Sequence, residues 1–404
     1  MIRKDKKVVA TLSVLAIICS SCGLYRLHEP EYVPNVIVGA GLSGVVMAER
    51  IASERGEKVL IIEKRDHVGG NVYDYQDTNG VTVQKYGIHA FHTNDKKVWN
   101  YLSQFTKWHD YQHQALAETS KGNVNFPVNL NTINQLFDKD FAKDFTSKLL
   151  AKYGKDAKIS VSDLQNAKDE ILQKGAEILY EELFKNYTIK QWGMRVDEVD
   201  PSVIARVPIY LTYKDAYFTD KYQGIPAKGY TAMIKKMLDN PLIEVRLNTT
   251  WEDQRQYVRY DKLFFSGSID TFFDYKYGKL PYRSLRFDIK QLPQEYYQQR
   301  AQVNHANHPS MTRSIEHKYM LDEKTPTTTV SFEYPEAFNG ENERYYPINK
   351  PQNAELYAKY QQEADKLKNV YFFGRLGDYK YYNMDQAVAR ALELYDKVFV
   401  KSKN

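Results

Sequence analysis

A glycine-rich turn between a buried strand and a helix constrains this chain more than any other feature. The apolar run 36–38 predicts a strand, and Gly39, Gly41 and Gly44 follow it just before a helical pattern begins. In such a turn, one glycine allows the tight bend, one lets the backbone approach a pyrophosphate, and one lets the helix pack closely on the strand. The helix N-terminus then presents free N–H groups and a positive dipole end to phosphates. The pattern predicts a dinucleotide-binding unit.

The next strand strengthens this prediction. The run 58–62 reads as a second strand and ends at Glu63, about 20 residues after the turn, where a carboxylate accepts hydrogen bonds from a ribose diol. The pair Gly69 and Gly70 follows in the segment DHVGGN, a second fingerprint that is typical of FAD enzymes rather than NAD enzymes. An ordinary glycine-rich turn without a ligand is the alternative interpretation.

Composition limits the class of protein. The chain has 404 residues, of which 43% are hydrophobic and 26% charged, as expected for a globular protein of two or more lobes. A net charge of +5 is mild, so it gives no electrostatic case for nucleic acid, although it agrees with an anionic ligand. Both cysteines, Cys19 and Cys22, precede the first strand. The globular region therefore has no disulfide framework, thiol nucleophile or cysteine metal site.

Two histidines three residues apart, His89 and His92, lie in the segment YGIHAFHTND. A tetrahedral metal site needs further ligands, and none is suitably placed, so we predict no metal. Packed histidines and flavin or substrate contacts remain the alternatives. The Thr-Asn-Asp end of the segment is expected to cap a helix that begins near Lys96.

The rest of the chain divides into regions of different pattern. Residues 132 to about 195 read as helical, with a capping box that starts at Ser162, whereas 204–223 alternate like a strand and 280–346 are mostly β. A strand at 370–373 then runs into Gly374 and a helix from about Met384, a second helix N-terminus suited to a flavin.

We predict an α/β fold: a Rossmann-like FAD-binding domain with an inserted helical lobe and a mixed or antiparallel β-sheet domain. The expected boundaries are 1–34 for an N-terminal extension, 35–125 with 225–270 and 365–404 for a discontinuous FAD-binding domain, 126–200 for the helical lobe, and 201–224 with 271–364 for the β-sheet domain.

Several segments together resemble the bacterial UDP-galactopyranose mutases. They are VGAGLSG, IEKRDHVGGN, YGIHAFHTND, YTIKQWGM, RVPIYLTYKDAYFTDKYQGIP, GYTAMIKKML, MTRSIEHKY, YYPI and GRLGDYKYYNMD, in this order. The resemblance covers residues 35 to about 400. It implies a flavin-dependent, non-redox isomerisation of UDP-galactopyranose to UDP-galactofuranose through an adduct between N5 of reduced FAD and the sugar, which feeds galactofuranose into cell-surface glycans. The sequence offers no partnered Ser, Cys or Lys nucleophile, as expected where the cofactor makes the bond.

The resemblance also assigns residues. It implies that Arg206 and Arg313 are catalytic and hold the UDP diphosphate, since guanidinium groups stay charged and offer paired donors, and that His92 lies beside the flavin. The expected substrate-binding residues are Phe184, Tyr187, Thr188, Trp192, Arg206, Tyr217, Asn304, Arg313, Tyr346 and Tyr381. The expected cofactor-binding residues are Gly39, Gly41, Ser43, Gly44, Glu63, Lys64, Gly69, Gly70, Asn71, His89, Val245 (beside the adenine), Gly374, Arg375, Tyr382, Asn383 and Met384.

Three positions depart from the family pattern or match it imperfectly. Asn304 aligns with the family's Asn before the second arginine only if one residue is deleted. Asn383 stands where the family usually has an acid in the tyrosine-rich loop, which keeps a hydrogen bond but removes a charge. His113 aligns roughly with an Asn found near the uridine in some members. An FAD-dependent oxidoreductase of the amine-oxidase type and an inactive sugar-nucleotide-binding homologue are the alternative functions. The resemblance further implies a homodimer, a reductant such as NAD(P)H or a flavin reductase, and no nucleic acid.

The N-terminal extension has the order of a secretory or lipoprotein signal. Basic residues precede the apolar run 8–18, which is followed by CSSCG and is shorter than the about 20 residues that span a bilayer. Because FAD and the UDP-sugar are cytosolic, we expect a cytoplasmic enzyme that associates with the inner membrane through residues 1–34. An exported lipoprotein acylated at Cys22 or Cys19 is the alternative.

Overall fold

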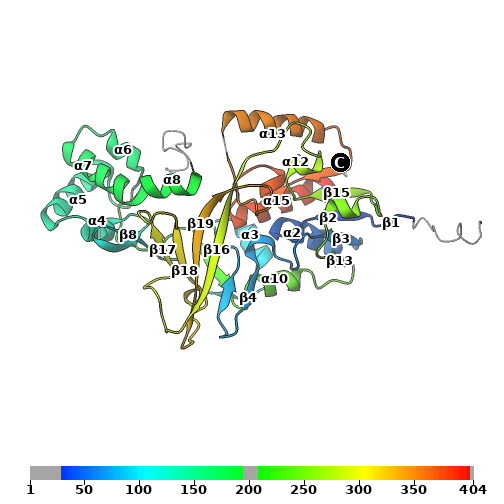
Figure 1. Ribbon diagram of the computed structural model, residues 1–404, viewed down its shortest axis with the longest axis horizontal. Coiled ribbons are helices and arrows are strands. Elements are labelled where there is room, and N and C mark those ends of the chain that lie inside the picture. The colour runs from blue at the N-terminus through cyan, green and yellow to red at the C-terminus, as the bar shows by residue number, and fades with distance from the viewer. Residues whose placement is uncertain (1–28, 194–207, 349, 401–404) are drawn as a thin grey trace, which may run out of the picture.

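The computed structural model describes residues 29–193, 208–348 and 350–400. Figure 1 shows three parts in a row: an α/β part at one end, a large twisted sheet in the middle and a helical lobe at the other end. The α/β part is built from segments that are far apart in the sequence.

A five-stranded parallel sheet forms the centre of the α/β part. Its strands, in spatial order, are β13 (Ile243–Arg246), β3 (Val59–Ile62), β2 (Asn35–Val38), β15 (Lys262–Phe265) and β21 (Val370–Phe372). The sequences of β2 and β3, NVIV and VLII, are almost uninterrupted apolar runs because both faces of a parallel sheet are covered. The strands predicted around 36–38, 58–62 and 370–373 are therefore confirmed.

Helices cover this sheet, and α2 packs directly against α15. The helices of the α/β part are α2 (Leu42–Arg50, continued by a π-helical turn Ile51–Arg55), α3 (Lys96–Leu102), α10 (Tyr230–Met237), α11 (Trp251–Gln254), α12 (Ile269–Phe272), α13 (Pro351–Ala364), α14 (Gly374–Gly377) and α15 (Met384–Tyr395, continued by Asp396–Val400). The helix starts predicted near Lys96 and Met384 are confirmed. Short strands complete this part: β1 (Glu31–Tyr32) pairs with β14 (Val258–Arg259), β4 (Asp74–Gln76) pairs with β5 (Thr82–Gln84), and β6 (Phe91–Thr93) and β7 (Trp108–His109) flank β12 (Tyr222–Pro226).

The middle part is a seven-stranded sheet that is antiparallel except for one pair. Its strands, in spatial order, are β20 (Tyr346–Pro347), β16 (Tyr282–Leu292), β19 (Thr328–Ala337), β18 (Arg313–Glu316), β17 (Gln302–His305), β8 (Ala115–Thr119) and β9 (Gly122–Phe126). The exception is the parallel pair of β17 with β8. The predicted boundary at residue 125 differs here, because it left β8 and most of β9 in the nucleotide part. Only this long-range pairing reveals where they belong.

The helical lobe follows β9. It contains α4 (Leu130–Leu136), α5 (Lys139–Tyr153), α6 (Val161–Gln165), α7 (Glu170–Leu179), a π-helical turn (Tyr180–Lys185) and α8 (Asn186–Trp192), with β10 (Lys158–Ile159) pairing with β11 (Ile209–Tyr210). The predicted start of the capping box is wrong by two residues. Ser160 Oγ accepts the Asp163 N–H at 3.1 Å, and the Asp163 carboxylate accepts the Ser160 N–H at 3.1 Å.

The strand predicted across 204–223 is wrong for most of its described part. Only β11 and the start of β12 are extended and paired, and the residues between them form a loop. Asp215 fixes this loop, since its Oδ1 accepts side-chain amide N–H groups from Asn125, Asn129 and Asn131 at 2.8–3.0 Å. Side-chain hydrogen bonds within the loop thus take the place of the strand-to-strand backbone hydrogen bonds that the alternating pattern predicted. Within the three described ranges, no helix is long and apolar enough to cross a bilayer.

Candidate functional site

A cavity of about 520 Å³ opens at the carboxyl ends of β2, β3 and β15. Since β3 and β15 flank β2 on opposite sides, the cavity lies where the direction of chain connection reverses, the usual ligand site of an open parallel sheet. Its volume falls within the range of small-molecule and cofactor sites.

Two glycine turns form one wall of the cavity and touch each other. Gly41 and Gly69 form an isolated parallel bridge, and a Cβ on Gly70 would lie 2.8 Å from the Cα of Gly41. Gly39 and Gly70 have φ angles of +100° and +56°, which side chains rarely permit. Backbone atoms therefore line this wall, and the space that side chains would otherwise occupy stays open.

Glu63 lies at the end of β3, with its carboxylate fixed by two backbone amides. Its Oε2 accepts the Ala40 N–H at 2.7 Å and its Oε1 accepts the Arg65 N–H at 2.9 Å. The first of these bonds joins β3 to the glycine turn after β2, so the acid and the turn keep a fixed relative position.

The N-terminus of α15 and Arg375 form the opposite side. The Arg375 guanidinium donates to the Tyr382 carbonyl at 2.7 Å and to the Tyr345 carbonyl at 3.2 Å. Asn383 is the N-cap of α15, and its N–H is accepted by Gln386 Oε1 at 2.9 Å. A fixed cation and a helix N-terminus thus face the same space.

A second region, outside this cavity, surrounds Arg313 on β18. Arg313 Nε and Nη2 both donate to the Glu333 carboxylate, at 2.7–3.0 Å, and Glu333 is 0% exposed. Burial alone would lower the pKa of Arg313, but Glu333, Tyr187 and Tyr346 raise it well above its usual value. The half-buried guanidinium therefore keeps its charge beside a fully buried carboxylate.

Four tyrosines share the electrostatic environment of Arg313. They are Tyr187 on α8, Tyr217 in the Asp215 loop, Tyr346 on β20 and Tyr381 before α15. Burial is the main cause that raises the pKa of Tyr187, Tyr217 and Tyr346, so these hydroxyls stay protonated and able to donate. The rings of Tyr346 and Tyr381 stack at 5.3 Å, and Arg375 lies 5.0 Å from the Tyr381 ring centre. Arg375 therefore joins this cluster to the cavity.

Comparison with known proteins identifies the family. The UDP-galactopyranose mutase family model matches residues 182–381, and the NAD(P)-binding Rossmann-like domain model matches residues 37–105. A probable UDP-galactopyranose mutase from Klebsiella pneumoniae is 39% identical over 367 residues, which are 90% of this chain and 94% of that protein. This chain belongs to the UDP-galactopyranose mutase family. The predicted family and the predicted α/β fold with a Rossmann-like domain are therefore confirmed. Membership of this family also supports FAD as the cofactor.

Other members and solved structures agree. A dTDP-fucopyranose mutase from Escherichia coli is 35% identical over 366 residues, covering 89% of this chain and 96% of that protein. The fold also matches a crystal structure of reduced UDP-galactopyranose mutase with a TM-score of 0.71 at 15% identity, over 92% of this chain and 96% of that chain. At that identity the structural match speaks for the fold alone.

Most of the residues expected to bind FAD line the mutase cavity. These are Gly39, Gly41, Ser43, Glu63, Lys64, Gly69, Gly70, Asn71, His89, Gly374, Arg375, Tyr382, Asn383 and Met384. Gly44 lies beneath the turn, where a Cβ would come 1.9 Å from the Gly39 carbonyl oxygen. Val245 differs from its expected place, because its side chain packs on the apolar core, and the cavity is lined instead by residues further along the chain, from Thr249 to Glu252.

The two histidines of the YGIHAFHTND segment lie in different places. His89 lines the cavity, and its Nδ1 is 2.8 Å from the Gly87 carbonyl oxygen. Burial, with the positive charges of Arg375 and Arg313, lowers the pKa of His89 to about 4, so the ring is neutral at pH 7. His92, which was expected beside the flavin, is not among the described residues that line the cavity. Its Nδ1 is 2.9 Å from Asp220, and its ring stacks on Phe218 at 3.6 Å.

The remaining substrate predictions divide into three groups. Trp192 lies 6.4 Å from the Tyr346 ring, and Asn304 is the β17 partner of Arg313, so both are near the tyrosine cluster. Phe184 is buried in the apolar core of the helical lobe, and Thr188 is buried on α8. Arg206 lies outside the described residues.

Sequence reasoning missed an acidic residue of the cavity wall. Glu343, in the loop between β19 and β20, binds Lys64 Nζ at 2.9 Å and Arg65 Nη2 at 3.0 Å. Burial raises the pKa of Glu343, but hydrogen bonds and attraction from Arg65 and then Lys64 outweigh it and lower that pKa to about 2. No motif marks this residue, since its partners are almost 280 positions away in the chain. Among the described residues, no group of three or more metal-ligating side chains occurs.

Proposed function

We propose that this protein converts UDP-galactopyranose to UDP-galactofuranose in a flavin-dependent isomerisation without net redox change. The observation that carries the proposal is the Arg313 cluster: a charged guanidinium, paired with a buried carboxylate and surrounded by tyrosines, beside a dinucleotide cavity. A nucleoside diphosphate leaving group needs this kind of charge and these donors.

FAD fits the cavity that the glycine turns leave open. Gly39, Gly41 and the N-terminus of α2 suit its pyrophosphate, Glu63 suits the ribose, and Arg375 with the start of α15 suits the flavin end. When bound and reduced, FAD supplies the nucleophile that attacks the sugar, so the protein itself needs none.

The side chains of the second region then bind and orient the substrate. Arg313 holds the diphosphate, and Arg206 is proposed to share this task. Tyr346 and Tyr381 donate hydroxyls to phosphate oxygens, as does Tyr217. Tyr187 stacks on the uracil, with Trp192, Phe184, Thr188 and Asn304 assigned to the same substrate site.

We place His89, rather than His92, beside the flavin. In neutral His89 the Nδ1–H donates to the Gly87 carbonyl, so Nε2 carries a lone pair and can accept a hydrogen bond. His92 is assigned a positioning role, since its contacts with Asp220 and Phe218 order the chain next to Tyr217.

Reduced and oxidised protein distinguish this function from its rivals. Dithionite-reduced protein should convert UDP-galactofuranose to the pyranose with no net electron transfer, whereas oxidised protein should be inactive. An amine-oxidase type enzyme would consume oxygen with its amine substrate, and an inactive binding homologue, which Asn383 favours, would retain FAD without turnover. A panel of UDP-hexoses and dTDP-fucopyranose would establish which sugar nucleotide is used.

The oligomeric state, the reductant, the cellular location and the domain boundaries are also proposed. We propose a homodimer that is reduced by NAD(P)H or a flavin reductase, and a cytoplasmic catalytic part associated with the inner membrane through residues 1–34. The domain boundaries are kept, except that 115–125 join the β-sheet domain with which they pair. Fractionation with and without globomycin tests the location. A lipid mass shift at Cys22 or Cys19 together with periplasmic protease access would contradict it.

A further inference from the structure

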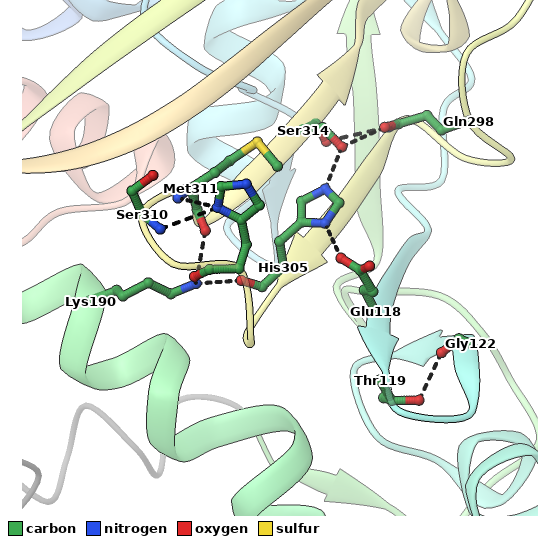
Figure 2. Close-up of polar contacts among 10 residues, drawn as sticks. Glu118, Thr119, Gly122, Lys190, Gln298, His305, Ser310, Met311 and Ser314 are labelled. Carbon is green, nitrogen blue, oxygen red and sulfur yellow. Dashed lines mark hydrogen bonds and ion pairs between the residues drawn. The ribbon is translucent and has the colours of Figure 1, made fainter.

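Lys190 on α8 inserts its ammonium group into the turn between β17 and β18. Figure 2 shows its Nζ among backbone carbonyls of that turn, and it donates to those of His305, His308 and Met311 at 2.5, 2.6 and 2.8 Å. Three protons meet three acceptors, so each donor of the ammonium has a partner. Burial lowers the pKa of Lys190 to about 8, with Glu118 acting in the opposite direction, and the amine is still protonated at pH 7.

The turn is shaped by its own side chains rather than by Lys190. His308 Nδ1 accepts the N–H groups of Ser310 and Met311, at 3.2 and 2.9 Å. His305 bridges the neighbouring strands, with Nδ1 2.6 Å from Glu118 on β8 and Nε2 2.8 Å from Ser314 on β18 (Figure 2). The carbonyl oxygens therefore form a cation-binding cradle that the fold of the turn itself supports.

The carboxyl end of α8 is held independently by a second cation. Arg283 on β16 donates to the Gln191 carbonyl at 3.0 Å and to the Lys190 carbonyl at 3.3 Å. Gly193 follows in the left-handed region, with φ +62°, and a Cβ there would lie 2.7 Å from Arg283 Nη1. Arg283 thus satisfies carbonyls that a helix end leaves free.

The two contacts join elements that carry different parts of the site. Helix α8 bears Tyr187 and Trp192, while Arg313 directly follows the turn and pairs with Asn304 across the hairpin. Arg283 holds the carboxyl end of α8 on β16, and Asn186 donates to Asn307 Oδ1 at 2.9 Å. Among the described residues, however, the three hydrogen bonds of Lys190 make the most extensive polar contact between α8 and the turn. Lys190 therefore links the helix that carries Tyr187 to the hairpin that carries Arg313.

We propose that Lys190 is a positioning residue for the substrate: by filling the carbonyl cradle of residues 305–311, it locks α8 to the β17–β18 hairpin and sets the spacing between the uracil-stacking and diphosphate-binding side chains. This inference rests on the proposed function for the identity of the substrate, but the docking of α8 is a property of the protein alone.

Hydrogen exchange and ligand binding test the proposal in the full-length FAD protein. In Lys190→Met, which keeps the length and removes the donors, the amides of 186–193 should exchange at least about five times faster than in the wild type. UDP, used as the probe, should bind about ten times more weakly, and KM should rise more than kcat falls. FAD content should stay at the wild-type level, because no cavity residue is changed.

A matched variant on the same segment is Lys185→Met. Lys185 pairs with exposed Glu181, one turn away, and touches no carbonyl of the cradle. Its exchange, UDP affinity and turnover should equal those of the wild type. If Lys190→Met folds poorly, His308→Ala provides the second route, since it loosens the cradle without changing α8 and should also speed exchange at 186–193.

The outcomes separate the two proposals. Wild-type exchange in α8 and unchanged UDP affinity in both Lys190→Met and His308→Ala would overturn the positioning role. A wild-type protein whose reduced form converts no sugar nucleotide would overturn the proposed function, while the exchange measurement would still decide whether Lys190 locks the helix.

Discussion

The FAD cavity and the Arg313 cluster, which we propose to bind FAD and the substrate diphosphate, are built from different parts of the chain. The cavity wall is largely backbone, in which Gly41 and Gly69 touch and Glu63 is fixed by two peptide N–H groups. The cluster is made of side chains from α8, β18, β19, β20, the Asp215 loop and the segment before α15. Backbone sites tolerate few changes of shape, whereas side-chain sites depend on how distant elements dock.

The two regions also differ in how they keep a positive charge. Arg375, on the cavity side, donates to two backbone carbonyls and lies over the Tyr381 ring, whereas Arg313 pairs with the buried carboxylate of Glu333. A buried pair is costly to form and more costly to break, because the remaining charge has no solvent. We therefore expect glycine substitutions to damage the cavity by steric conflict and charge substitutions to damage the cluster by electrostatics.

The largest effect on FAD binding is expected for Gly44→Ala. A Cβ there would lie 1.9 Å from the Gly39 carbonyl oxygen, so α2 must move away from the turn. We expect loss of bound FAD and a decrease of about 3 kcal/mol in the free energy of unfolding. Flavin absorbance per chain after gel filtration and urea unfolding measure both. Gly80→Ala is the control, since nothing lies within 4 Å of its Cβ and only backbone strain of about 1 kcal/mol remains. Full FAD occupancy in Gly44→Ala would contradict the steric account.

Arg313→Ala should reduce turnover by at least about 100-fold, the scale of a lost electrostatic contact in a closed site. It also leaves Glu333 unpaired, at a cost of about 3–5 kcal/mol in unfolding free energy. Arg313→Ala combined with Glu333→Gln should regain most of that stability but none of the turnover, which separates the two roles. Arg286→Ala is the matched control on the same sheet, because its exposed pair with Glu336 contributes less than about 1 kcal/mol. Near-normal turnover in Arg313→Ala would refute its assignment.

The cavity, built from contiguous motifs, can be predicted from the sequence, whereas the side-chain cluster, built from distant elements, cannot. Gly39, Gly41, Glu63 and the second glycine pair are contiguous motifs whose geometry follows from the residue types, so the nucleotide part is predicted almost strand by strand. The substrate-side residues were placed only by resemblance. Nothing local predicts that β8 pairs with β17, that Glu343 reaches Lys64, or that Lys190 enters a turn more than 100 residues away. These contacts arise when separate elements dock.

One histidine on each side, His89 and His113, should make the protein sensitive to mild acid. Burial lowers the pKa of His89 and of His113 to about 4, from 6.5. The unfolded chain therefore binds more protons, so stability is complete above pH 6.5 and falls as the pH drops towards 4. We expect each histidine to account for about 1–3 kcal/mol of this loss.

Urea unfolding at pH 7.5, 6 and 5 measures the effect region by region. His113→Gln probes the cluster side, where the ring lies between Tyr111 and Gln302, and His89→Gln probes the cavity side. Each variant should show a flatter pH dependence than the wild type, even if it is less stable at pH 7.5. An unfolding free energy as steep in both variants as in the wild type would show that the acid sensitivity lies elsewhere.

The smallest effect is expected for Glu343→Gln, which tests whether side chains as well as backbone close the cavity. The variant keeps the shape but weakens the contacts with Lys64 and Arg65, so we expect FAD to bind about ten times more weakly and the unfolding free energy to decrease by about 1–2 kcal/mol near pH 7, after allowance for solvent screening. Because the pKa of Glu343 is lowered from 4.5 to about 2, its contribution to the free energy of unfolding is present above pH 4.5 and lost as the pH falls to about 2. The difference in unfolding free energy between wild type and variant should therefore shrink between pH 4.5 and about pH 2. Glu363→Gln, a similarly paired carboxylate on α13, is the control and should leave FAD affinity unchanged. If Glu343→Gln also leaves it unchanged, the backbone turns alone hold the cofactor, and the contrast between the two regions is sharper than proposed.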